Sequence, residues 1–279
     1  MPALTLRSFI VLALSACLFA LLAGPSPAKQ PEEAPWSTGY MSRSRLLTGS
    51  AEGKLVAGVE IEMAQGWKTY WRSPGESGVP PSFDWAGSEN LAGATVLYPA
   101  PRRFTDPTGD TIGYGDAVIF PVELQPQDPS KPVRVRLKLD YGICKHICVP
   151  AEVSLAAEID GAGARIPQAV EAALAQVPRH ATVRKDADPV LKGIEAVVTG
   201  DKPHIVLEAQ FPGGTSGADA FVEAGNGTFV PPPRQLDSRG TNTLRFIVDL
   251  DDADELEGQT LTVTLVSDAG VSETHTKLP

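Results

Sequence analysis

The feature that most constrains this chain is a long period-two alternation between residues 133 and 159. From Val133 to Ile143 every odd-numbered residue is apolar and the even-numbered residues are charged or Gly. The same parity resumes from Val149 to Ile159, where the even-numbered residues are mostly polar or Pro. Such alternation is typical of antiparallel strands with one buried face. The two runs therefore predict a pair of long strands joined by a short turn.

A turn at residues 145–147 fixes the register of this pair. In that register the directly opposed residues are Leu137 and Leu155, Leu139 and Val153, Ile143 and Val149, and Arg134 and Glu158. Apolar residues then face apolar residues along the ladder, which is what sets strand register. Three-residue hairpin loops usually need Gly in a left-handed position. Lys145-His146-Ile147 contains none, so we expect an irregular turn.

Two cysteines flank the predicted turn. Cys144 and Cys148 are both even-numbered, so parity predicts that both lie on the solvent face, directly opposite each other. Opposed residues are about 4.5–5.5 Å apart, within reach of a disulfide. We favour a redox-active pair, with a passive local staple and a metal site as alternatives. A five-residue loop stabilises a fold by only about 2 kcal/mol.

The N-terminal segment indicates export. Arg7 is followed by an apolar stretch from Ser8 to Gly24, and residues 26–28 offer small side chains for signal peptidase, which predicts a signal peptide at residues 1–28. Residues 14–17, ending in Cys17, also match a lipobox, so lipoprotein anchoring is the alternative. An exported chain permits disulfides, and Cys144 and Cys148 are its two remaining cysteines. We expect a periplasmic protein.

Composition narrows the fold and function classes. The 279 residues include 26 Gly and 25 Pro, and 6% are aromatic, which favours short strands joined by turns over a helical bundle. The formal net charge of −10 argues against a general nucleic-acid binder and against adhesion to anionic membranes. The length suggests two domains.

Several segments together resemble a known family. The hairpin Tyr141-Gly142-Ile143-Cys144-Lys145-His146-Ile147-Cys148-Val149-Pro150-Ala151-Glu152 is similar to the active-site hairpin of the N-terminal periplasmic domain of DsbD and of ScsB-like proteins. Residues 65–72, 104–107 and 113–122 resemble other segments of that domain, and the resemblance spans about residues 40–160. It implies an immunoglobulin-like β-sandwich over residues 29–160. Only three residues separate the cysteines, as in the ScsB-like branch, whereas DsbD has a wider spacing.

The resemblance also implies site residues and partners. Cys144 and Cys148 would be the catalytic disulfide pair, with Cys148 forming the mixed disulfide and Cys144 resolving it. The partners would be thioredoxin-like periplasmic proteins and a membrane-embedded thiol reductase, with no cofactor. Cytochrome c biogenesis and copper tolerance are the processes expected. The membrane and thioredoxin-like domains of those relatives do not follow in this sequence, so the chain would not carry electrons across a membrane alone.

A cap loop shields the cysteines in the family. Its candidates here are Phe104 and Tyr114; the alternative is that both are ordinary core or strand-end aromatics. Tyr141, Lys145 and His146 complete the expected environment of the cysteines. For the remaining residues near these segments we expect simpler roles, namely solvated turns for Asp106 and Asp110, and core or edge packing for Trp67, Tyr70 and Trp71.

The last part of the chain, residues 161–279, predicts a second, smaller β-domain. A linker at residues 160–164 and a short helix, Ala169–Val177, come before its strands. Strands are expected at Ile194–Val198, Ile205–Phe211, Leu244–Leu250 and Leu261–Val266. The acidic run from Asp249 to Glu257 is read as a solvated loop. Scattered through this part are His180, His204 and His275, which are expected to be surface residues.

Three functions from different classes remain. The first is a thiol–disulfide oxidoreductase or electron-relay module that uses Cys144 and Cys148. The second is a Cu(I)-binding protein that uses the same cysteines and His146, because Cu(I) prefers thiolates. The chain has only three Met residues, which argues against the second. The third is a non-catalytic adaptor whose β-domains dock a membrane partner.

Overall fold

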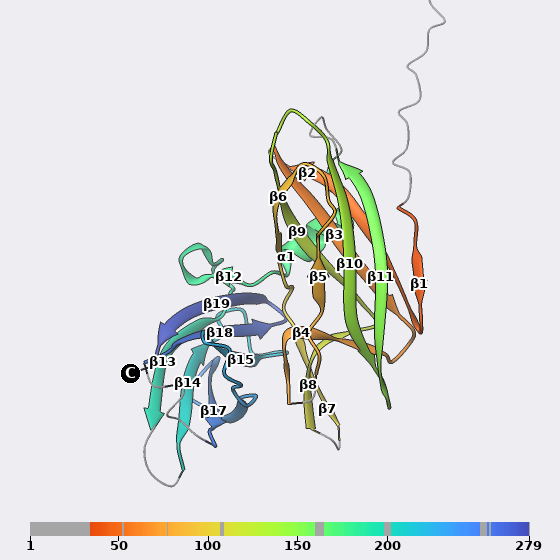
Figure 1. The fold of residues 1–279 in the computed structure, drawn as a ribbon. Coiled ribbons are helices and arrows are strands. Elements are labelled where there is room, and N and C mark those ends of the chain that lie inside the picture. Colours follow the sequence, from red (N-terminus) through yellow and green to blue (C-terminus); the bar gives the residue numbers. More distant parts are fainter. Residues whose placement is uncertain are drawn as a thin grey trace, which may run out of the picture. The chain divides into compact units, whose positions relative to one another are not determined.

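The computed structural model describes residues 34–278, except residues 52, 77, 107–108, 160–164, 198–201, 252–255 and 257. The predicted signal peptide, the linker at 160–164 and much of the acidic run at 249–257 lie outside the described residues. Four sheets account for most of the described chain (Figure 1). Two of them come from residues 37–159, which we call the first lobe, and two from residues 179–277, the second lobe. The predicted all-β class is therefore confirmed.

The first lobe is a sandwich of two antiparallel sheets. One sheet has the order β1 (Ser37–Gly39), β2 (Ser42–Ala51), β3 (Lys54–Met63), β9 (Ala117–Pro126) and β6 (Leu91–Val96). The other has the order β11 (Cys148–Ile159), β10 (Val133–Cys144), β4 (Lys68–Gly75), β8 (Gly109–Gly115) and β7 (Arg102–Asp106), and β5 (Ser82–Asp84) also pairs with β10.

A single apolar cluster fills the sandwich. Its fully buried members come from both sheets, for example Ile61 and Phe120 from one and Trp71, Leu137 and Leu139 from the other. The odd-numbered residues of β10 are all buried, and the even-numbered ones from Arg134 to Asp140 are exposed. The alternation in the sequence is thus the alternation between this core and solvent.

The predicted hairpin forms with the predicted register. Leu137 faces Leu155, Ile143 faces Val149, and the ladder runs without a bulge from Val133 to Cys144. On the outer face the opposed Arg134 and Glu158 form an ion pair of 2.9 Å. Both ends of the hairpin are therefore fixed by the sequence pattern, including the pairing of Cys144 with Cys148.

The helix begins one residue before, and ends two residues before, the predicted bounds. It spans α1 (Gln168–Ala175), and its fully buried Val170 packs with Val56 and Ile166 against the first sheet. This contact needs Gly58, because a Cβ at that position would lie 2.6 Å from a methyl carbon of Val170. The helix is therefore attached to the first lobe. No helix in the described ranges is long and apolar enough to cross a membrane.

The second lobe consists of two four-stranded sheets. Their orders are β12 (Arg179–His180), β19 (Gly270–Lys277), β18 (Thr260–Ser267), β15 (Asp219–Ala224), and β13 (Val190–Val197), β14 (His204–Gln210), β17 (Thr243–Asp249), β16 (Arg234–Ser238). A short 3₁₀ turn, η1 (Ala181–Val183), follows β12. The four predicted strands are present, whereas β12, β15, β16 and β19 were not expected from the sequence. Phe211 and Phe246 are buried in the core of this lobe.

The two lobes also share buried contacts. Phe221 of β15 is buried in the cluster of the first lobe, with its ring 5.6 Å from that of Trp71. Next to it, Arg72 of β4 pairs with both Glu223, at 2.7 Å, and Glu273, at 2.5 Å. Arg103 of β7 pairs with Asp110 of the first lobe and with Asp219 of the second, each at 2.8 Å. These contacts belong to one compact unit, residues 35–279.

Candidate functional site

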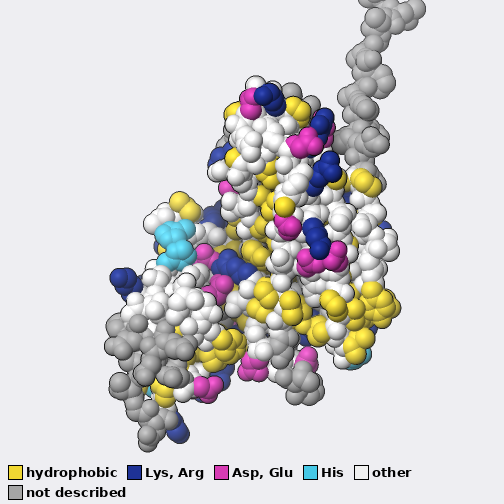
Figure 2. Space-filling model, viewed as in Figure 1, with side chains coloured by type: hydrophobic (Ala, Val, Ile, Leu, Met, Phe, Trp, Pro, Cys, Tyr) yellow, Lys and Arg dark blue, Asp and Glu magenta, His cyan; other side chains and the backbone are white. Residues whose placement is uncertain are grey.

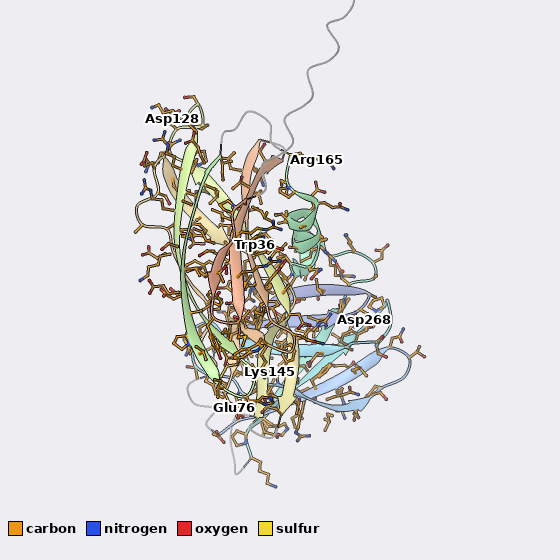
Figure 3. All side chains as sticks on the ribbon, turned by 90° about the vertical axis from the view of Figure 1, so that its right-hand side faces the viewer. Trp36, Glu76, Asp128, Lys145, Arg165 and Asp268 are labelled. Atoms are coloured by element: carbon orange, nitrogen blue, oxygen red, sulfur yellow. A yellow bond between two sulfur atoms is a disulfide. The ribbon has the colours of Figure 1, made fainter. Side chains whose placement is uncertain are left out.

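Cys144 and Cys148 close the end of the β10–β11 hairpin. They form a disulfide, and their Cα atoms are 4.2 Å apart. The connection between them, residues 145–147, is a bend in which the N–H of Lys145 donates to the C=O of Ile147 over 3.1 Å. None of these three residues has a positive φ, so the turn is irregular, as predicted. Figure 3 places Lys145 at the end of the first lobe that lies opposite Asp128.

The two cysteines differ in exposure, which corrects the prediction that both face solvent. Cys148 is exposed, but Cys144 is only 2% exposed. The cause is Tyr70, which comes from the neighbouring strand β4 and lies over the even-numbered face of β10. Its ring occupies the space beside Gly142, where a Cβ would be 2.8 Å from a ring carbon. The outer face of β10 is therefore exposed to solvent as far as Asp140 and covered by Tyr70 beyond it.

Tyr70 contacts both sulfur atoms. Its hydroxyl oxygen lies 2.5 Å from Sγ of Cys144 and 3.1 Å from Sγ of Cys148. A disulfide sulfur carries no hydrogen, so the tyrosine hydroxyl must donate. Burial raises the pKa of Tyr70, and the negative charge of Asp106 raises this pKa further, so the hydroxyl keeps its proton at neutral pH. The sequence predicted only a packing role for Tyr70.

Lys68 brings a positive charge to the same face. It pairs directly with Cys144 in the ladder between β4 and β10, so the two side chains project to the same side of the sheet. Its Nζ lies 3.3 Å from Oδ2 of Asp106 and 5.5 Å from the ring centre of Phe104. A nearby cation favours a thiolate over a thiol. Lys68 and Tyr70 are even-numbered and lie on the side of the sheet that carries Cys144, whereas the odd-numbered Trp67 and Trp71 lie in the core.

The predicted cap-loop region is a second hairpin, β7–β8, whose turn lies outside the described residues. The ring of Phe104 lies beside Nζ of Lys68, which is the strand partner of Cys144. Tyr114 instead packs in the sandwich core, with its ring 5.4 Å from Phe120. Its hydroxyl donates to the C=O of Pro99 over 2.8 Å, and burial raises its pKa. Tyr114 is therefore a core aromatic, which was the alternative to its cap-loop role.

Asp110 does not behave as the solvated turn residue predicted. It accepts a hydrogen bond of 2.8 Å from Arg103 and one of 2.7 Å from Thr105. Burial opposes its charge, but these bonds lower its pKa overall. Its carboxylate therefore fixes the guanidinium that also reaches the second lobe, where Arg103 pairs with Asp219 at 2.8 Å.

Tyr141, Lys145 and His146 were predicted around the cysteines. Tyr141 points to the other face of the sheet, where its hydroxyl lies 2.8 Å from the Ser42 hydroxyl in the sandwich interior. Lys145 is exposed, and its Nζ donates to the C=O of Gln65 over 3.2 Å. His146 is exposed in the turn. Of the three, only Lys145 and His146 thus border the disulfide, as neighbours in sequence.

A groove opens beside Cys148. Its volume is about 680 Å³. Apolar residues dominate its lining, which consists of Tyr70, Val79, Pro80, Ser82, Asp140, Tyr141, Gly142, Cys148, Val149, Pro150, Ala151 and Glu152. Val79, which lines the groove, is 66% exposed, and Ile147, in the turn, is 59% exposed. Figure 2 shows hydrophobic side chains gathered over this end of the first lobe. We call this cavity the Cys148 groove.

The residues in the described ranges form no group of three or more His, Cys, Asp or Glu side chains that could hold a metal ion. Two histidines that are far apart in the sequence do meet, however. The rings of His180 and His275 are 5.7 Å apart on the second lobe, and Nε2 of His275 lies 3.3 Å from Glu273. They are therefore surface residues as predicted, but they are not scattered.

The comparisons with known proteins agree with this architecture. A search of curated proteins gave no match. Among solved structures, the chain is similar to the N-terminal periplasmic domain of ScsB from Proteus mirabilis, with a TM-score of 0.69 and 22% identity over 88% of this chain and 97% of that one. This likeness shows an immunoglobulin-like fold of the kind predicted. Residues 46–159 match the family model described as "Thiol:disulfide interchange protein DsbD, N-terminal", and this span contains β4, the β10–β11 hairpin and both cysteines. The part of the chain that is similar to the N-terminal domain of DsbD is therefore the sandwich of the first lobe with its cysteine hairpin.

Proposed function

We propose that this protein relays reducing equivalents between partner proteins through the Cys144–Cys148 pair. The observation that carries this proposal is the inequality of the two sulfurs. Cys148 is exposed and adjoins a groove, whereas Cys144 is buried under the hydroxyl of Tyr70. Thiol–disulfide exchange needs one accessible sulfur and one leaving sulfur, and this geometry supplies both.

The reaction proceeds through a mixed disulfide. A thiolate of a reduced partner attacks Sγ of Cys148, the bond to Sγ of Cys144 breaks, and Cys144 leaves as a thiolate that takes up a proton. A second thiolate of the partner then attacks the partner's own sulfur and releases Cys148 as a thiolate, which is also protonated. Two electrons and two protons reach this chain, and the partner becomes a disulfide. The reverse sequence reduces the next partner.

Tyr70 and Lys68 assist the departure of Cys144. The Tyr70 hydroxyl already touches this sulfur at 2.5 Å and donates a hydrogen bond to it as negative charge develops. Lys68, on the same face, adds a positive charge that favours the thiolate. Since Cys144 is shielded from water, its charge depends on these two neighbours rather than on solvent.

The disulfide contributes little to holding the fold together. It closes a five-residue loop, for which chain entropy gives about 2 kcal/mol. The uninterrupted twelve-residue ladder between β10 and β11 already joins the same two strands. A bond that adds so little to stability can open and close during turnover, which supports a redox role over that of a passive staple.

We infer that the partners are thioredoxin-like proteins and a membrane-embedded thiol reductase in the periplasm. The family of residues 46–159 supports thiol–disulfide partners in general. The similar ScsB domain is periplasmic by its description, which supports that compartment for this chain. Neither partner is a nucleic acid, which the net charge of −10 would repel.

The test is to trap the mixed disulfide in cells that export the full-length chain. Cys144→Ala removes the resolving thiol and should accumulate a covalent, reductant-sensitive complex through Cys148. Cys148→Ala is the matched control, because it removes one cysteine from the same pair but leaves only the buried sulfur. Diagonal electrophoresis and mass spectrometry identify the complexes. Trapping by Cys148→Ala alone would reverse the two roles.

Trapping by neither variant, with stoichiometric Cu(I) binding by the wild-type protein, would replace the proposal with the copper-binding function. The relay role would also fail if the reduced wild-type chain transferred no electrons to any disulfide.

A further inference from the structure

We propose that the Cys148 groove selects the polypeptide that flanks the partner's reactive cysteine, and that it prefers an extended segment with an apolar residue and then a cation. This inference rests on the proposed function and adds the chemistry of the partner. The groove begins at Cys148, so any protein that forms a disulfide with this sulfur must place its neighbouring residues near or in it.

The floor of the groove is the outer face of the β10–β11 hairpin. Moving away from Cys148 along this face, the next opposed pair is Gly142 and Pro150, and the following pair is Asp140 and Glu152. Val79, Pro80 and Ser82 border the groove at the β5 side. The groove is therefore apolar next to the sulfur and acidic farther along.

The acidic pair is unusual within its own hairpin. On the outer face Arg134 opposes Glu158, and Lys138 opposes Ser154, so charges meet opposite charges or neutral residues. Asp140 and Glu152 are the exception, because two carboxylates directly opposed on a sheet repel each other. Lys138 offsets this only in part, since its Nζ lies 3.3 Å from Glu152 and both partners are exposed. A cation supplied by the partner would remove the repulsion.

The spacing gives the partner's pattern. Strand residues advance about 3.3 Å each and alternate between faces. An extended segment whose cysteine sulfur meets Cys148 would place the second residue from its cysteine over Gly142 and Pro150, and the fourth over Asp140 and Glu152. The favoured occupant thus carries an apolar side chain two residues from its cysteine and Lys or Arg four residues from it.

The same charges disfavour small anionic thiols. Glutathione carries two carboxylates and one ammonium group, so its net negative charge would be brought toward Asp140 and Glu152. It also lacks a side chain long enough to fill the apolar part of the groove. The proposed occupant of the groove is therefore a protein segment, and glutathione is the competing ligand against which it is tested.

The experiment measures how fast the reduced full-length protein exchanges with peptide disulfides. The probes are extended peptides with Val two residues and Lys four residues from a single Cys, coupled to thionitrobenzoate, whose release is followed by absorbance. Matched peptides replace Lys with Glu, and the pattern is placed on either side of the Cys in separate peptides. Cys148 attacks the peptide sulfur and thionitrobenzoate leaves as the thiolate, because it is the more acidic thiol.

We expect the better Lys peptide to exchange about tenfold faster than its Glu counterpart at low salt, with the ratio falling as salt screens the charges. Glu152→Gln should lower this ratio about threefold. Glu158→Gln is the matched control, because it also removes an exposed glutamate that pairs with a cation of β10, but it lies outside the groove. Equal losses in the two variants would show a general charge effect and overturn the inference.

A second variant tests occupancy rather than charge. Ser82 is exposed and lines the groove, so Ser82→Trp fills the space without disturbing the core. It should slow exchange with both peptides several-fold and leave reduction of the oxidised protein by dithiothreitol unchanged. Unchanged peptide rates, or glutathione disulfide reacting as fast as the Lys peptide, would overturn the inference. If the wild-type protein exchanged with no disulfide at all, the proposed function would fail and the inference with it. If the wild-type protein exchanged with disulfides but showed no preference for the Lys peptide, the inference about the groove would fail and the proposed function would stand.

Discussion

A single tyrosine makes the two cysteines unequal. Tyr70 covers Cys144, donates a hydrogen bond toward both sulfurs and forms one wall of the Cys148 groove. Its raised pKa keeps the proton on the hydroxyl, so it acts as a donor throughout the physiological pH range. The difference in exposure between the two sulfurs therefore depends on a residue from outside the hairpin.

This arrangement predicts how the reduced, folded protein reacts with alkylating reagents. Iodoacetamide should modify Cys148 rapidly and Cys144 at least about tenfold more slowly, because Cys144 is buried. Tyr70→Ala should bring the rate at Cys144 close to that at Cys148. Mass spectrometry of quenched samples measures both sites in one experiment.

Tyr141→Phe is the control for this prediction. It removes a tyrosine hydroxyl three residues from Cys144, but on the opposite face of β10, where it contacts Ser42. It should leave both rates unchanged. Equal labelling of the two cysteines in the wild-type protein would contradict the cover that we assign to Tyr70.

The sequence could predict the cysteine pair but not the exposure of each member. Parity places Cys144 and Cys148 on one face, and it holds for all neighbours up to Asp140. Parity cannot show that a side chain of another strand covers the end of that face, at Gly142 and Cys144. This cover depends on Tyr70, more than seventy residues earlier. The signal that was available is parity within β4, where Tyr70 alternates with Trp71 and shares a side with Lys68.

At the scale of elements, the strands predicted correctly are those with the clearest alternation of apolar and polar residues in the sequence. The β10–β11 register was predicted residue by residue because apolar pairs exclude every shifted alternative. In the second lobe, β16 and β19 were missed because their exposed and polar residues give no clear apolar period. The run Asp219–Ala224 was missed because it is short and lies between glycine-rich segments.

One element of the second lobe depends on a buried carboxylate. Asp188 is almost fully buried and accepts hydrogen bonds from Nε and Nη2 of Arg179, and from the backbone N–H groups of Lys185 and Val271. It thereby joins β12 to the start of β19. Gly270 leaves room for it, because a Cβ there would lie 2.4 Å from Oδ1 of Asp188.

We predict that Asp188→Asn destabilises the protein by about 3 kcal/mol at neutral pH, because it leaves Arg179 without its charged partner. Burial opposes the charge of Asp188, but its hydrogen bonds lower the pKa below the unfolded value of about 3.9. The contribution is therefore fully present above that value and is lost as the pH falls through the lower, folded pKa. Urea unfolding at several pH values measures both effects, and the difference between variant and wild type should shrink in acid.

Asp237→Asn is the matched control, since Asp237 also accepts two hydrogen bonds from an arginine, Arg245, but its side chain is 42% exposed. It should change stability far less than Asp188→Asn. A loss at Asp188 that stayed constant down to the lowest pH would show that shape, and not charge, is what the site requires.

At the scale of the whole molecule, the predicted division into two domains remains to be tested. Each lobe has its own core, but Phe221 of the second lobe is buried in the cluster of the first. Ion pairs from Arg72 and Arg103 surround this contact. The sequence offered no means to predict these pairs, because they join residues more than a hundred positions apart and follow no local period.

We predict that the two lobes unfold together and that Phe221→Ala separates them, at a cost of about 3 kcal/mol. All four tryptophans (Trp36, Trp67, Trp71 and Trp85) precede residue 160, so fluorescence reports on the first lobe, while circular dichroism reports on all strands. The two denaturation curves should coincide in the wild-type protein and diverge in the variant.

Phe246→Leu serves as the control, because it weakens the core of the second lobe without touching the first. Its two curves should shift together. Divergent curves for the wild-type protein would mean that the shared contact does not couple the lobes.

Three consecutive residues of β4 serve three different neighbours. Tyr70 contacts the sulfurs, Trp71 packs on Phe221, and Arg72 binds Glu223 and Glu273. The environment of the cysteine hairpin therefore depends on residues outside the matched span 46–159. If residues 46–159 were grafted onto another scaffold, the indole of Trp71 would lose its contact with Phe221 and the guanidinium of Arg72 would lose both glutamates. A shift of the β4 backbone that accommodated these two side chains would also move the Tyr70 hydroxyl away from Cys144.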